Sequence, residues 1–94
     1  MAHTFEELVQ MQYVADEAHT TVEQLQDQYG PPTRTAWTDD QQASWSTAWR
    51  AWRDLAADVQ AAVTEHAKEQ GIPRHQVEAD VKKSARHPEL VAGG

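Results

Sequence analysis

The sequence predicts an all-α fold, in which a long antiparallel helical hairpin of the coiled-coil type is followed by a short C-terminal helix. Two stretches place apolar residues at alternating steps of three and four, which puts each set on one stripe of a helix. The stripes consist of Leu8, Met11, Ala15, Ala18, Val22, Leu25 and Tyr29, and of Trp45, Ala48, Trp52, Leu55, Val59, Ala62 and His66. Capping signals bound both stretches, and no strand-like alternation is present. A length of 94 residues fits one domain, 1–94.

The first helix is predicted over residues 5–29. Thr4 is followed three positions later by Glu7, the spacing of a capping box, in which each side chain bonds the other residue's backbone N–H. Gly30 suits a left-handed cap, and the two prolines after it cannot continue a helix. We therefore expect the helix to end before a loop over residues 30–38.

The second helix is predicted over residues 39–70. Thr38 and Gln41 form a second capping box, and the first turn carries two aspartates, which the helix dipole favours there. The apolar stripe then continues to a glycine at position 71. This helix is long enough to pair with the whole of the first.

A short third helix is predicted over residues 73–87. Pro73 suits the first helical position because its fixed φ matches a helix and it needs no N–H partner there. Pro88 ends the segment, and residues 88–94 are expected to fray.

Because the loop is short, the two long helices should be antiparallel neighbours, with small residues opposite large ones. In the predicted register Ala15 and Ala18 lie opposite Leu55 and Trp52. The pairs at the loop end are Val22 with Ala48 and Leu25 with Trp45.

Some apolar residues fall outside the seam between the helices and are candidates for an interaction surface. Trp49 and Val63 extend the stripe of the second helix, and Val9 and Tyr13 lie beside that of the first. A wider stripe requires a third partner. We therefore expect Val9, Tyr13, Trp49 and Val63 to contact a protein partner or a second copy in a homodimer.

The charge distribution disfavours broad nucleic-acid binding. The net charge is −7, and the first 30 residues contain six carboxylates and no lysine or arginine. An acidic surface repels phosphate backbones.

A DNA-binding regulator is nevertheless the alternative to an interaction protein. Ala67, Gly71, Ile72 and Val77 follow the spacing of a small residue, a turn glycine and two apolar residues. Residues 62–86 thereby resemble a helix-turn-helix, which implies DNA recognition by the second helix of the motif. The contacts implied by this resemblance are Arg74, His75, Gln76, Lys82, Lys83 and Arg86.

The residues give no support for an enzyme or for a bound cofactor. There is no cysteine, phosphate loop or nucleophile elbow. His3, Glu7, His66 and Glu69 should approach one another at the open end of the hairpin, but no Glu-x-x-His pair accompanies them. We therefore expect no catalytic residue, metal or cofactor.

No apolar run approaches the roughly 18 to 20 residues that cross a bilayer, and no signal peptide is recognisable at the N-terminus. We expect a cytoplasmic protein without membrane partners. Its Ala-, Asp-, Gln- and Trp-rich composition is similar to that of small helical proteins of high-GC bacteria. The sequence therefore favours a small, non-catalytic, helical interaction or adaptor protein.

Overall fold

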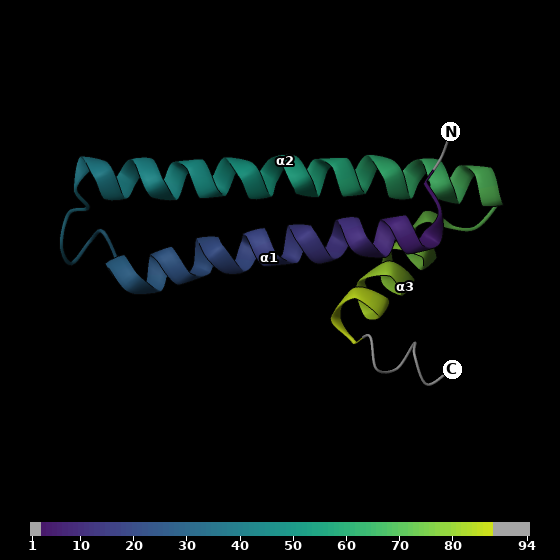
Figure 1. The fold of residues 1–94 in the computed structure, drawn as a ribbon, viewed down its shortest axis with the longest axis horizontal. Helices are drawn as coiled ribbons and strands as arrows, with labels where there is room; N and C mark the ends of the chain where they lie inside the picture. Colours follow the sequence, from purple (N-terminus) through teal and green to yellow (C-terminus); the bar gives the residue numbers. More distant parts are fainter. Residues whose placement is uncertain (1–2, 88–94) are drawn as a thin grey trace.

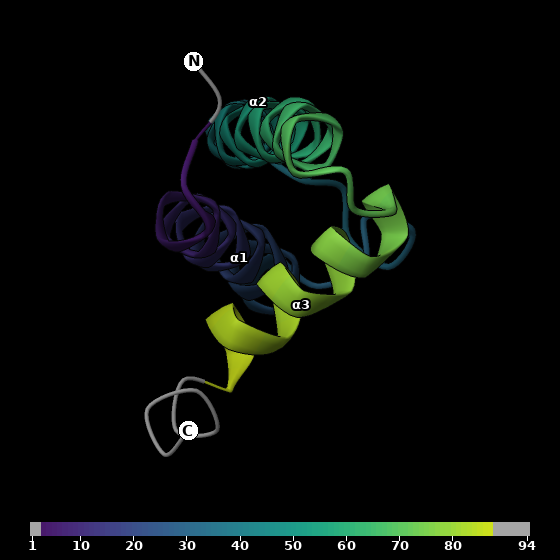
Figure 2. The ribbon, with the colours of Figure 1, turned by 90° about the vertical axis from the view of Figure 1, so that its right-hand side faces the viewer.

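The structure is a computed structural model that describes residues 3–87, and the regular elements of this part of the chain are helices (Figure 1). They are α1 (Phe5–Tyr29), α2 (Asp39–Gln70) and α3 (Arg74–Arg86). Helices α1 and α2 lie side by side and antiparallel, and α3 crosses one face of this hairpin at its open end (Figures 1 and 2). The predicted all-α hairpin is confirmed. The tail at 88–94 lies outside the described residues.

Both long helices begin at capping boxes. The Glu7 backbone N–H donates to the Thr4 hydroxyl at 3.2 Å, and the Thr4 N–H donates to the Glu7 carboxylate at 3.1 Å. Thr38 and Gln41 exchange the same two bonds at 3.1 and 3.0 Å. Each box satisfies backbone donors that would otherwise lack partners, and so fixes where the helix starts.

The helix ends differ from the prediction at Gly30 and at both ends of α3, which was predicted over residues 73–87 and runs over Arg74–Arg86. Gly71 has φ 65° and ψ 33°, the left-handed conformation expected at the end of α2. Gly30 also has a positive φ of 74°, but its ψ of 175° is extended. The cause is Pro31, because a proline ring pushes the residue before it out of helical ψ values. Pro73 precedes α3 as its N-cap, so this helix begins one residue later than predicted.

Two contacts fix the register of the hairpin. The ring of His19 lies 4.7 Å from that of Trp52, one position from the predicted pairing of Ala18 with Trp52. At the open end the His66 Nδ1 lies 2.8 Å from the backbone oxygen of His3. The predicted seam residues are accordingly buried or half-buried along both helices.

The core lies at the open end, where all three helices meet. Leu8, Val63 and Val81 come from the three different helices and are fully buried. The remaining members of this cluster are Ala15, Val59, Ala62, Ala67 and Val77. No residue between 23 and 58 is fully buried, although this stretch contains all four tryptophans. The tip of the hairpin is thus a two-helix structure without a closed core.

Candidate interaction face

One line of α2 passes from the covered to the uncovered part of the hairpin. Trp49, Ala56 and Val63 are spaced seven residues apart, so they lie along one side of the helix. Helix α3 covers Val63, whose side chain is 1% exposed. Ala56 and Trp49 are only half-buried. The line therefore leaves the three-helix core and continues along a side of α2 that has no third helix.

Aromatic rings lie in contact with one another along this side of α2. The ring centroids of Trp37 and Trp45 are 5.8 Å apart, and Trp45 stacks on Trp49 at 6.2 Å with 23° between the planes. The guanidinium of Arg53 lies 5.0 Å from the centre of the Trp49 ring, which is a cation–π contact. We call the surface formed by Trp45, Trp49, Trp52 and His19 the tryptophan face.

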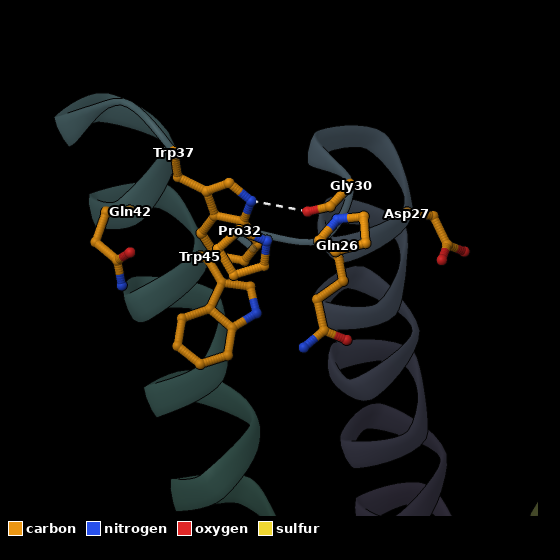
Figure 3. Close-up of a pocket in the computed structure, with 8 residues that line it drawn as sticks. Gln26, Asp27, Gly30, Pro32, Trp37, Gln42 and Trp45 are labelled. Carbon is orange, nitrogen blue, oxygen red and sulfur yellow. Dashed lines mark hydrogen bonds between the residues drawn. The ribbon is translucent and has the colours of Figure 1, made fainter. Parts of the chain in front are cut away.

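A hollow lies at each end of the tryptophan face. The α3 hollow has a volume of about 260 Å³ and is lined by Asp16, His19, Trp52, Ala56 and Arg86, among others. The tip hollow has a volume of about 590 Å³ and lies beside the loop (Figure 3). Its lining consists of Gln26, Asp27, Gly30, Pro31, Pro32, Trp37, Gln42 and Trp45.

The two indoles of the tip hollow differ in how their N–H groups are satisfied. The Trp37 Nε1 donates to the Gly30 backbone oxygen at 2.8 Å, which ties the start of α2 to the end of α1 (Figure 3). Trp37 also packs edge-on against Tyr29 at 5.5 Å. The Trp45 Nε1 is shielded from solvent and is the one such side-chain atom in residues 3–87 without a hydrogen-bond partner. A shielded, unpaired donor costs stability, so the tip is not optimised for stability alone.

Helix α1 lines the other side of the face with carboxylates. Residues 12, 16, 19, 23 and 26 alternate steps of four and three, so they form one stripe that connects the two hollows. Asp16 and Glu23 belong to this stripe, and Asp27 adjoins it in the tip hollow. We call these three carboxylates the acidic rim. Glu23 lies 3.0 Å from the His19 Nδ1, and His19 in turn contacts Trp52.

The first carboxylate of the acidic rim binds α3. Arg86 donates to both oxygens of Asp16 at 3.2 Å, and the buried Gln12 amide donates to the same carboxylate at 2.9 Å. Burial alone would raise the pKa of Asp16, but the hydrogen bonds from Arg86 and Gln12 outweigh it, and the pKa lies below its ordinary value. Within the described residues no lysine or arginine forms an ion pair with Glu23 or Asp27.

The four residues predicted as an interaction surface do not form one patch. Val63 belongs to the core, and its prediction as a contact residue is wrong, because α3 folds over this part of α2. Val9 and Tyr13 lie on another side of α1, around a hollow that they share with Ala85 of α3. Trp49 alone lies on the tryptophan face.

Three of the six predicted DNA contacts are engaged within the chain. Arg74 donates to Glu78 and to the Thr64 hydroxyl, both at 2.8 Å, and also to the Gln60 side chain. Lys82 pairs with Glu78 at 2.8 Å, and this bond, which outweighs partial burial, lowers the pKa of Glu78 with further help from Arg74. Arg86 is held by Asp16. The remaining predicted contacts, His75, Gln76 and Lys83, are exposed on α3.

The acidic rim, the place of His19 on the tryptophan face and the tip hollow were not predicted from the sequence. The signal for the rim was present in the spacing of positions 16, 23 and 27, which is helical, but only the fold shows that this stripe borders the tryptophans. The proline loop gave no signal that it would leave an open hollow between Trp37 and Trp45.

The His3, Glu7, His66 and Glu69 cluster considered from the sequence does not assemble in full. His3 lies 3.3 Å from Glu7, and His66 turns its Nδ1 to a backbone oxygen. Among residues 3–87, no group of three or more histidines and carboxylates is arranged to hold a metal.

The chain matches no protein-family model, no curated protein and no solved structure. In the described part of the chain, no helix is both long and apolar enough to span a membrane.

Proposed function

We propose that this protein is a small, non-catalytic interaction module that binds a helix of another protein on its tryptophan face. The observation that carries the proposal is the uneven burial of the hairpin. Where α3 crosses the hairpin, the core residues are fully buried, whereas Trp45 and Trp49, beyond α3, and Trp52, beside its last turn, remain half-buried. Large aromatic side chains that are only half-covered in a folded chain are typical anchors of protein interfaces.

The shape of the face supports a helical partner. An amphipathic helix binds in a groove through apolar residues spaced three and four apart. The stripe from Gln12 to Gln26 spans about 21 Å, or four turns, at the rise of an α-helix. A partner segment of about 15 residues would cover the tryptophans between the two hollows.

Site-specific photo-crosslinking in the native host tests this function. A photoreactive amino acid at position 49 should give a discrete crosslinked product. The same amino acid at position 47 is the matched control, because Thr47 is exposed and lies on nearly the opposite side of α2. Equal products from both positions, or none from position 49, would overturn the proposal.

The DNA-binding alternative predicts a different behaviour. Phosphate contacts make binding fade steeply between about 50 and 200 mM salt, and Lys83→Ala should weaken it. The pairing of Arg74, Lys82 and Arg86 with carboxylates favours the interaction module instead. A gel shift with mixed duplex DNA at low salt distinguishes the two, and we expect no retarded band.

A further inference from the structure

We infer that the partner helix is basic and amphipathic, with an apolar stripe against the tryptophan face and lysine or arginine along its flank toward α1. This inference rests on the proposed function and names the chemistry of the partner. Its basis is that the chain already contains one helix, α3, that uses this chemistry on the same side of the hairpin, next to the tryptophan face.

Helix α3 shows which side chains this side of the hairpin accepts beside the tryptophan face. Val77, Val81 and Ala85 are spaced four apart and buried against the hairpin, so they form the apolar stripe. One position after this stripe, Arg86 reaches the Asp16 carboxylate of the acidic rim. An apolar stripe with a cation on the α1 side is thus the pattern of the helix that is already docked.

The acidic rim continues beyond α3 without a further lysine or arginine among the described residues. Glu23 and Asp27 follow Asp16 toward the tip by about two and three turns, and neither pairs with a lysine or arginine in the described residues. Helix α1 carries six carboxylates and no lysine or arginine, so it contributes a negative potential to this side of the face. A cationic flank on the partner would complement this rim as Arg86 does.

The opposite side of the face is not acidic to the same degree. Arg53 lies over the Trp49 ring, and Gln42 and Gln60 line the two hollows. Only the flank toward α1 therefore requires cations, and the flank toward α2 is better matched by neutral or acidic side chains.

A second copy of this chain fits the tryptophan face poorly. Two hairpins stacked on this face with their tips at opposite ends would place one α1 against the other, so that two acidic rims meet. With their tips at the same end, both α3 helices would occupy the same space, since each crosses this face at the open end (Figure 2). In addition, the α3 helix of each copy is already engaged by its own hairpin.

The test measures binding of two synthetic 18-residue amphipathic helices by isothermal titration calorimetry with the full chain at low salt. Both peptides have the same apolar face of leucine and alanine. The lysine peptide carries lysine on the flanks of this face, and the glutamate peptide carries glutamate there. We expect the lysine peptide to bind at least about tenfold more tightly than the glutamate peptide. Trp49→Ala should weaken binding of the lysine peptide by about tenfold. Circular dichroism should show that the variant keeps its helicity.

A pair of charge variants separates rim contacts from general attraction to an acidic protein. The double variant Glu23→Gln with Asp27→Asn should weaken binding of the lysine peptide by about fivefold. Asp58→Asn with Glu65→Gln changes the net charge equally on exposed positions of α2 and should change the affinity less than about twofold. Equal losses in both double variants would overturn the inference.

The remaining outcomes distinguish the inference from the proposed function. If both peptides bind equally and Trp49→Ala abolishes both, the face docks helices but the inferred charge is wrong. If neither peptide binds and light scattering gives a mass of two chains that Trp49→Ala halves, a second copy occupies the face and the inference fails. If neither peptide binds and the chain is monomeric, the inference and the proposed function both fail.

Discussion

Arg86 of α3 and Asp16 of α1 are joined by two hydrogen bonds of 3.2 Å across 70 residues of sequence. Asp16 also accepts a bond from the buried residue Gln12, so its carboxylate is held by donors from both α1 and α3. This contact fixes the C-terminal end of α3 on the hairpin and marks where the tryptophan face begins.

The Asp16 contact makes stability depend on pH. The pKa of Asp16 is lower in the folded chain than in the unfolded chain, so the carboxylate stabilises the fold above its ordinary pKa of 3.8. This contribution is lost as the pH falls below about 4 and the folded carboxylate is protonated. Asp16→Asn should lower the free energy of unfolding by about 1 kcal/mol at neutral pH, and by less at about pH 2.5. Urea unfolding across this range measures both curves, and parallel curves would show that Asp16 is not the group involved.

Leu8 should be the most costly position of α1 to truncate. Its side chain is 0% exposed and packs where the three helices meet, so Leu8→Ala should reduce the free energy of unfolding by about 3 kcal/mol. Val14 is on the same helix but 45% exposed, and Val14→Ala should cost less than about 0.5 kcal/mol. Chemical denaturation measures the free energy of unfolding of both variants. Similar losses would mean that Leu8 is not part of the core.

Gly71 isolates the cost of a left-handed backbone. Its φ is 65°, and a Cβ built there would have no atom within 4 Å, so no steric clash accompanies the substitution. Gly71→Ala should therefore cost only the backbone strain, about 1 kcal/mol. Asn adopts the left-handed conformation more readily than Ala, so Gly71→Asn should cost less stability than Gly71→Ala. Thermal unfolding of both variants measures the two costs. An equal loss for both residues would argue against the left-handed cap.

The two indoles of the tip hollow provide a matched pair. Trp37→Phe removes the hydrogen bond to Gly30, whereas Trp45→Phe removes a donor that has no partner. Because leaving a buried donor unpaired is itself unfavourable, Trp45→Phe should be less destabilising than Trp37→Phe by about 1 kcal/mol. Urea unfolding of both variants gives the difference, and the reverse order would mean that the N–H of Trp45 is satisfied in solution.

The sequence was sufficient for the fold because local signals and periodicity agreed. The two capping boxes at Thr4 and Thr38 and the glycine at position 71 mark helix boundaries by local chemistry, which needs no knowledge of tertiary structure. The apolar residues at alternating steps of three and four predicted the seam, and these residues are buried or half-buried in the hairpin.

The candidate site could be predicted only in part, because it depends on where α3 docks. Trp49 and Val63 are equivalent in the helical repeat, and nothing local distinguishes them. The crossing of α3 buries Val63 and leaves Trp49 half-buried, which is a tertiary effect. Likewise, Asp16 and Arg86 are separated by most of the chain, so their pairing follows from the fold alone.

Titration of the ¹⁵N-labelled chain with the lysine-flanked peptide, followed by NMR, shows whether a helix binds on the tryptophan face. Each of the four tryptophans gives its own indole N–H signal. We expect the signals of Trp45, Trp49 and Trp52 to shift together on binding, whereas the backbone signals of Val9 and Tyr13, on the other side of α1, should not shift. Shifts centred on Val9 and Tyr13 with unchanged indole signals would contradict this prediction.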